Sequence, residues 1–144
     1  MAHEDAGHYA AKHPKGTQMN SQIADQVTRH LVDGKISCAA AHKIAEDLGI
    51  SPTEVGVTID LLERRIHQCL LGLFGYSPKR RIIEPAEQVA PELQHAIEAA
   101  SEEQGLACAA AWELAERFKV SKVEISSACE ALQIKIFSCQ LGTF

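Results

Sequence analysis

Apolar residues in the first half of the chain follow helical spacing in three consecutive stretches. In the first stretch, Ile23, Val27 and Leu31 recur every four residues, so they fall on one face of a helix. After the third stretch, apolar and polar residues alternate, which is typical of a strand with one buried face. The predicted elements are, in chain order, a helix over residues 21–33, a short extended piece over 35–37, helices over 38–48 and 52–63, and a strand over 65–70.

Capping residues support the boundaries of the second and third helices. Gly49 directly follows the second helix, and a left-handed glycine commonly ends a helix at this position. Ser51 precedes the third helix as its N-cap, and Glu54 completes a capping box with it. Pro52 takes the first helical position, where an amide hydrogen is not needed. We therefore expect the two helices to be joined by a short turn.

The second half of the chain repeats the same pattern at a constant offset of 70 residues. Residues 38–74 and 108–144 align without a gap and are identical at 14 of 37 positions. A duplication of this length indicates two copies of one supersecondary unit. The predicted elements of the second copy are helices over residues 91–104, 108–118 and 122–132 and a strand over 134–139. The predicted domains are a mobile polar tail over residues 1–20, a first module over 21–74, a linker over 75–90 and a second module over 91–144.

The turn between the second and third helices has the residue types of a helix-turn-helix motif. Ala45 is small where the third helix crosses the second, and Gly49 suits the left-handed turn between them. Residues 44–51, together with Val55, thus resemble the helix-turn-helix family, and the flanking strands resemble its winged variety. The resemblance implies a mainly α fold with short β-strands, in two winged helix-turn-helix-like three-helix modules related by internal duplication. Two copies that each end in Cys-x-Leu-Gly-x-Phe also resemble small uncharacterised bacterial proteins.

Charge bears on DNA binding, which the resemblance assigns to the third helix of each module. The chain has a net charge of −5, and the third helices carry Glu54, Asp60 and Glu124. Such helices offer few side chains that read base edges. We expect a non-catalytic regulatory or adaptor protein that docks a protein partner, with a DNA-binding transcriptional regulator as the alternative. In that alternative, the phosphate contacts come from Arg64, Arg65, Lys79, Arg80, Arg81 and Lys122.

Four of the five cysteines occupy equivalent positions in the two copies. One position opens the second helix and the other ends the final strand, so the two thiols of a module are expected to be neighbours. Three uses stay open, namely buried apolar packing, metal ligation and thiol redox chemistry. A ligand set of four thiolates suits zinc or an iron–sulfur cluster, although the chain has no Cys-x-x-Cys motif. The four candidate ligands are Cys38, Cys69, Cys108 and Cys139.

The Leu-Gly-x-Phe run behind each second cysteine also recurs. Its leucine and phenylalanine can cover the edge of a module while the glycine permits a bend. The alternative is a backbone loop wrapped close to a cysteine-bound centre. The second helix of the second copy carries the chain's only tryptophan, which is suited to anchor a contact with a partner. The residues expected to contact a partner are Trp112, Phe74 and Phe144.

No motif in the sequence indicates an enzyme. The chain lacks a phosphate-binding loop, a nucleophile elbow and any set of nucleophile, histidine and carboxylate that the pattern brings together. No apolar run approaches the roughly 18 residues that span a bilayer, and the N-terminus lacks the apolar core of a secretory signal. We therefore expect a cytoplasmic protein with reduced thiols and no membrane contact. The modules are expected to pack against each other or against a second chain, which leaves a homodimer open.

Overall fold

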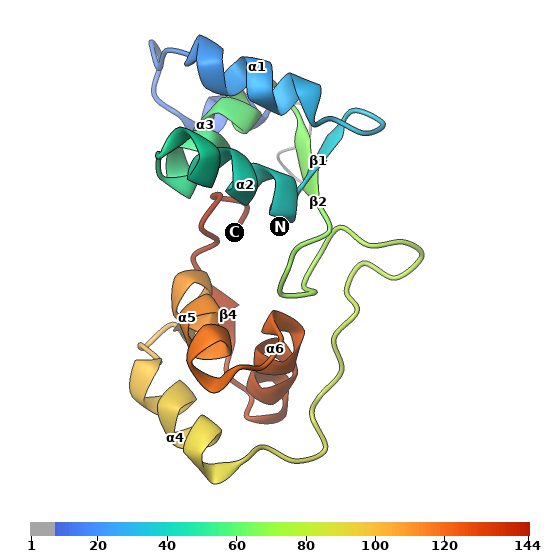
Figure 1. The fold of residues 1–144 in the computed structure, drawn as a ribbon, viewed down its shortest axis with the longest axis vertical. Coiled ribbons are helices and arrows are strands. Elements are labelled where there is room, and N and C mark those ends of the chain that lie inside the picture. Colours follow the sequence, from blue (N-terminus) through green and yellow to red (C-terminus); the bar gives the residue numbers. More distant parts are fainter. Residues whose placement is uncertain (1–7) are drawn as a thin grey trace. The chain divides into compact units, whose positions relative to one another are not determined.

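The structure is a computed structural model that describes residues 8–144. The first part of the predicted tail, residues 1–7, lies outside the described residues. Over the described range the protein is mainly α-helical, with six α-helices, one 3-10 helix and four short strands (Figure 1). The chain divides into two compact units. Unit 1 comprises Met1–Cys69 together with Gln140–Phe144, and unit 2 comprises Leu70–Cys139.

Unit 1 contains three α-helices and one pair of strands. Its elements are η1 (Tyr9–Lys12), α1 (Ser21–Arg29), β1 (Lys35–Ser37), α2 (Cys38–Leu48), α3 (Pro52–Leu61) and β2 (Arg65–His67). Each α-helix begins at a side-chain cap, because the oxygens of Asn20, Ser37 and Ser51 accept hydrogen bonds from amides in the first turn. Ser51 is the cap predicted for the third helix, whereas Ser37 was not predicted as the cap of the second. The first helix is capped by Asn20.

The turn between α2 and α3 has the expected geometry. Gly49 adopts the left-handed conformation, with φ 66°, and the amide of Ile50 donates to the Ala45 carbonyl over 3.0 Å. The Gly49 amide donates to the same carbonyl and to that of Glu46, so the turn satisfies carbonyls at the end of α2. The chain then turns into α3, which packs against α2. Figure 1 shows the two helices crossing, with β1 and β2 at their side.

The two strands of unit 1 form a parallel pair in which Ile36 lies opposite Ile66. The strand before the second helix therefore pairs with the strand after the third. The observed strand β2 ends at His67, whereas the prediction extended it to residue 70. The cause is Gln68, which has a φ of +52° and so cannot continue an extended strand.

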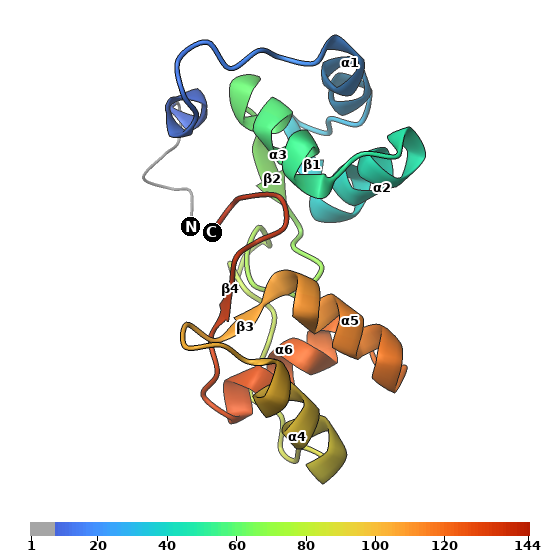
Figure 2. The ribbon, with the colours of Figure 1, turned by 90° about the vertical axis from the view of Figure 1, so that its left-hand side faces the viewer.

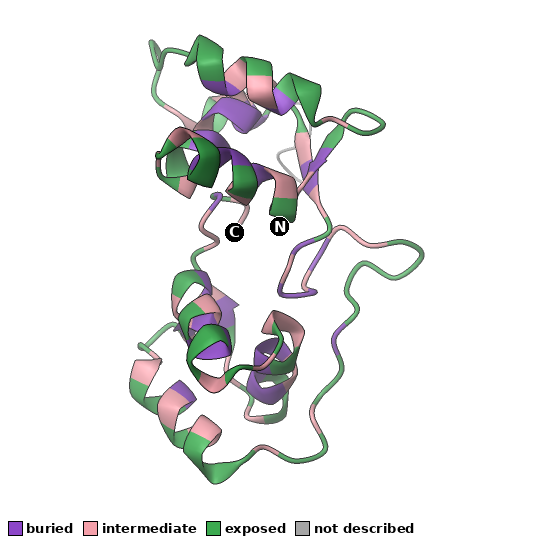
Figure 3. Cartoon of the chain, in the orientation of Figure 1, coloured by how far each residue is buried: buried purple, intermediate pink, exposed green. Residues whose placement is uncertain are grey.

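The core of unit 1 lies where the inner faces of α1, α2 and α3 meet β1 and β2, as the purple segments of Figure 3 show. It is built of aliphatic side chains that are at most 7% exposed. They are Ile23, Val27, Ile36, Ala41, Ile44, Ala45, Val55, Ile59 and Ile66. Ile23 and Val27, two of the three residues on the predicted face of the first helix, are in this core, whereas Leu31 lies beyond the end of α1 and is half-buried.

Unit 2 repeats this order of elements. They are α4 (Pro91–Ala100), β3 (Leu106–Ala107), α5 (Cys108–Phe118), α6 (Lys122–Ala131) and β4 (Ile136–Phe137). The strand register is offset by 70 residues from unit 1, because Leu106 lies opposite Ile136 in a second parallel pair. Lys119 takes the place of Gly49 and adopts the same left-handed conformation, with φ 57°. The fold tolerates a side chain there, although glycine would be less strained.

Helix α4 is shorter than predicted and ends at Ala100 instead of residue 104. Ser101 is extended, and its hydroxyl donates to the Ile97 carbonyl over 2.7 Å. The next residues form a turn closed by the bridge between Glu102 and Gly105. The extended backbone of Ser101, with ψ 144°, and this turn end the helix before residue 104.

The two units are not the two consecutive repeats of the sequence. Residues 70–74, which end the first repeat, belong to unit 2, and Gln140–Phe144, which end the second repeat, belong to unit 1. We call these the first and second exchanged segments. The predicted ranges 21–74 and 91–144 therefore differ from the structural units at their ends. The predicted linker, residues 75–90, also belongs to unit 2, where Arg81 forms an ion pair with Glu130 at 2.9 Å.

The predicted tail is partly built into unit 1. Tyr9 is only 5% exposed, and η1 packs against α3. The Glu63 carboxylate accepts hydrogen bonds from the amides of Tyr9 and Ala10, both over 2.8 Å. These contacts fix residues that the sequence assigned to a mobile tail. Among the described residues, no helix combines the length and apolar character needed to cross a bilayer.

Candidate functional site

The second exchanged segment lies against the third helix of unit 1. Gly56 faces it from the middle of α3, and a Cβ built on this glycine would stand 2.8 Å from the Leu141 carbonyl carbon and closer still to its oxygen. Leu141 is only 2% exposed, and the Thr53 hydroxyl donates to the Gln140 carbonyl at 3.5 Å. The absence of a side chain at Gly56 thus lets two backbones approach closely. Figure 2 shows the segment, in dark red, running beside α3.

The first exchanged segment has the corresponding place in unit 2. A Cβ on Gly72 would come within 3.5 Å of Val123 on α6, the residue equivalent to Thr53. It would also meet Ile83 at 2.8 Å, and the amide of Ile82 donates to the Gly72 carbonyl over 3.0 Å. In both units, therefore, a Leu-Gly-x-Phe segment occupies a face of the third helix.

The aromatic residues of these segments differ in exposure. Phe74 is buried at 5% exposure, whereas Phe144 is half-buried. Gly72 and Gly142 have φ values of +77° and +81°, so each permits the bend that the sequence suggested. Of the two phenylalanines predicted to contact a partner, only Phe144 has substantial exposed surface.

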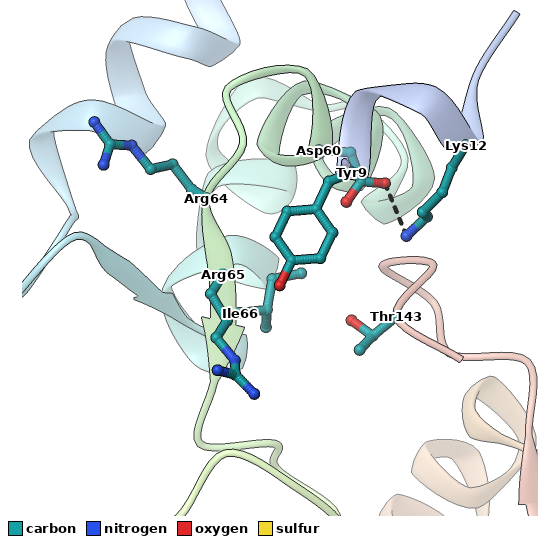
Figure 4. A pocket seen from close by; sticks show the side chains of 7 residues that line it. All are labelled: Tyr9, Lys12, Asp60, Arg64, Arg65, Ile66 and Thr143. Atoms are coloured by element: carbon teal, nitrogen blue, oxygen red, sulfur yellow. Dashed lines mark ion pairs between the residues drawn. The ribbon is translucent and has the colours of Figure 1, made fainter. Parts of the chain in front are cut away.

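A small hollow lies where η1, α3, β2 and the second exchanged segment meet (Figure 4). Its room of about 10 Å³ suffices for about one water molecule. The lining residues are Tyr9, Lys12, Asp60, Arg64, Arg65, Ile66 and Thr143. The hollow is too small for a substrate, so its side chains are best understood as a junction that holds chain segments together.

Asp60 is the centre of this junction. Its side chain is 9% exposed and contacts His13 Nε2 at 2.8 Å and Lys12 Nζ at 3.1 Å. Lys12 Nζ also donates to the Gly142 carbonyl over 3.0 Å. One ammonium group therefore links η1, α3 and the second exchanged segment. Sequence reasoning missed this junction, although a carboxylate on the buried side of a helix was a signal that it needed partners.

A broader groove runs along unit 2 between α5 and the start of α6. It has a volume of about 490 Å³ and is lined by Trp112, Glu113, Ala115, Glu116, Val120 and Lys122. Lys122 Nζ lies 4.5 Å from the centroid of the Trp112 ring, which is a cation–π contact. Trp112 is half-buried, and Glu113 and Glu116 are exposed beside it. An aromatic surface with an acidic rim can accept an apolar side chain flanked by basic groups.

The candidate cysteine ligands are divided between the units. Cys38 and Cys69 are buried in unit 1, while Cys108 is buried and Cys139 half-buried in unit 2. Ser37, directly before Cys38, and His67, two residues before Cys69, are register partners in the parallel strand pair. Across residues 8–144, no group of three or more histidine, cysteine, aspartate or glutamate side chains could hold a metal ion. Ligation of zinc or a cluster by the four thiolates stays a prediction, for which anaerobic purification and elemental analysis provide the test.

Cys129 should be the slowest cysteine to react with alkylating reagents. It is 1% exposed on α6 and aligns with Ile59 of the first repeat. Burial, assisted by the neighbouring Glu130 carboxylate, raises the pKa of its thiol to about 11, so the reactive thiolate is scarce at neutral pH. Mass spectrometry after timed iodoacetamide treatment at pH 7.5 should show Cys139 modified well before Cys129. Equal rates at the two sites would contradict the burial described for α6.

The cations predicted to hold DNA phosphates are divided between unit 1 and unit 2. Arg64 is exposed, and in Figure 4 its side chain points away from the hollow. Lys79 and Arg80 are exposed in the predicted linker. Two others are engaged within unit 2, because Arg81 pairs with Glu130 and Lys122 covers the Trp112 ring. Arg65 is half-buried on β2.

Comparisons with protein-family models, with curated proteins and with solved structures each give no match to this chain. The functional assignment therefore rests on the residues themselves.

The structure places Trp112 and Lys122 together in one groove. It puts the two Leu-Gly-x-Phe segments on the third helices, an arrangement for which the sequence carried no signal.

Proposed function

We propose that this chain is a non-catalytic regulatory or adaptor protein that docks a protein partner through the groove of unit 2. In this proposal the two units are winged helix-turn-helix-like modules that arose by duplication. The recurrence of helices, strand register and left-handed turn at an offset of 70 residues supports that origin. The observation that carries the function is Trp112, half-buried in a groove of about 490 Å³.

The chemistry of the groove favours a basic partner with an apolar anchor. Tryptophan is one of the side chains enriched in binding hot spots, and it contributes a large apolar surface. Here the ring forms the apolar part, and the exposed carboxylates of Glu113 and Glu116 form the rim. A peptide with an aliphatic or aromatic residue next to lysine or arginine matches both features.

The third helices are less suited to DNA than to structural contacts. In helix-turn-helix proteins that bind DNA, the third helix enters the major groove. In this chain the second exchanged segment lies against Gly56 of α3 and accepts a hydrogen bond from the exposed Thr53, and the first lies beside Val123 of α6. Insertion of either face into a groove of DNA would require the segment to leave. Protein docking needs no such displacement.

Replacing Trp112 by alanine should weaken partner binding by about 30-fold or more, the effect of losing a hot-spot side chain. Random peptides displayed on phage and selected on the full chain should be enriched in an apolar residue beside lysine or arginine. Their affinities, measured by fluorescence anisotropy, should fall for Trp112→Ala. The matched control is His42→Ala, because His42 holds the same position on α2.

Two results would overturn the docking proposal. One is a selection whose enriched peptides bind Trp112→Ala as tightly as the parent chain. The other is tight binding to random duplex DNA in a gel-shift assay with a steep dependence on salt, since phosphate contacts produce that dependence. The second result would establish the DNA-binding alternative instead.

A further inference from the structure

We propose that the face of α3 around Gly56 is a binding site for the Gln-Leu-Gly-Thr-Phe segment, and that a second copy of this chain supplies the segment in an end-exchanged dimer. The proposal is independent of the docking groove of unit 2. It rests on the division of the chain into units that do not coincide with its repeats.

The receptor, which is the face of α3 around Gly56, has a shape that fits the segment. Gly56 lies at a buried position of α3 and leaves room that the Leu141 carbonyl fills. The Thr53 hydroxyl meets the carbonyl of Gln140, and Lys12 Nζ meets the carbonyl of Gly142. Three successive residues of the segment are thus recognised through their backbone, and Leu141 supplies the buried apolar side chain.

The donor, which is the second exchanged segment, does not belong to the same repeat as its receptor. Unit 1 is built from the first repeat but receives the end of the second, and unit 2 receives the end of the first. All contacts just described are between the segment and α3 or η1, and none involves the connection that precedes residue 140. The same contacts therefore form when the segment arrives from another molecule. Exchange of an identical element between copies is a low-cost route to a dimer.

The intramolecular arrangement should dominate in dilute solution. A tethered segment has an effective concentration on the order of 1 mM, so a free chain competes only near that concentration or when the receptor is vacant. We therefore expect monomers at low concentration and exchanged dimers after refolding at high concentration. Variants that disable the receptor in one chain and the donor in another should associate readily.

A complementation experiment tests the proposal. Gly56→Leu blocks the receptor and keeps the donor, whereas Leu141→Asp spoils the donor and keeps the receptor. Each variant alone should sediment near the 15.7 kDa of one chain, and their equimolar mixture should give a complex of twice that mass. The control is the double variant Gly56→Leu/Leu141→Asp, which has neither part and should associate with neither single variant. A mixture of the single variants that stays monomeric would overturn the proposal.

A second measurement does not depend on how well the variants fold. Wild-type chains carrying donor or acceptor dyes are unfolded together, refolded at about 1 mM and then diluted. Energy transfer that is present at about 1 mM and is lost as the diluted chains return to monomers supports exchange. Equal energy transfer under both conditions, or none under either, refutes it.

Discussion

Replacing Gly56 by alanine should destabilise the protein by about 1–3 kcal/mol, the cost of overpacking a tight contact. The sign of this change in the free energy of unfolding is what tests the contact. Alanine in place of glycine within a helix normally gains about 0.4–1 kcal/mol, because the unfolded chain loses conformational freedom. Here the new methyl group would clash with backbone atoms of Leu141. Backbone atoms relieve such a clash less easily than the end of a flexible side chain does. Thermal and urea unfolding, followed by circular dichroism, measure the change.

The control is the same substitution in a chain that lacks the second exchanged segment. Without Gln140–Phe144, the three atoms nearest to a Cβ at Gly56, all from Leu141, are removed, so Gly56→Ala should recover the usual stabilising sign. The two experiments together form a mutant cycle that isolates the contact between the segment and α3. Stabilisation by alanine in the full-length chain would show that the segment does not lie on this helix.

Removing both partners of Asp60 should cost about 3 kcal/mol, because a nearly buried carboxylate is then left without compensation. The double variant is Lys12→Met with His13→Leu, which eliminates the contacts at 3.1 Å and 2.8 Å. Part of the loss comes from the Lys12 bond to the Gly142 carbonyl, which disappears as well. Chemical denaturation at pH 7 gives the free energy of unfolding for each chain.

Asp60→Asn separates the charge from the packing in this experiment. In the wild-type background the substitution should destabilise, since Lys12 and His13 lose the carboxylate that they contact. In the double-variant background it should stabilise, since it removes an uncompensated charge from a site that is 9% exposed. The same sign in both backgrounds would mean that Asp60 is solvated and that the junction contributes little.

The helices of this protein could be predicted from the sequence because their determinants are local. Ser51 and Glu54 start α3, and Gly49 ends α2, all within a few residues of the boundary that they set. The repeat added a second sample of the same pattern, which fixed the position of α5 and α6 even though Lys119 replaces the glycine. The errors fell at ends that depend on single residues, such as the left-handed Gln68 after β2.

The candidate sites were predicted only in part, because they depend on contacts between distant residues. Trp112 was identified as a partner contact from its residue type alone, but its pairing with Lys122 required the crossing of α5 and α6. The contact of His13 with Asp60 spans 47 residues and that of Lys12 with Gly142 spans 130. No local pattern distinguishes a segment that folds onto its own repeat from one that folds onto the other.

The reciprocal exchange of the two segments also determines what proteolysis can do to this protein. A protease that cuts the exposed stretch at residues 77–80 severs the covalent path between the repeats. The N-terminal fragment then still contributes residues 70–74 to unit 2, and the C-terminal fragment still contributes Gln140–Phe144 to unit 1. The two fragments of the nicked molecule therefore remain associated without a covalent link. They should co-elute in gel filtration until a denaturant unfolds both units.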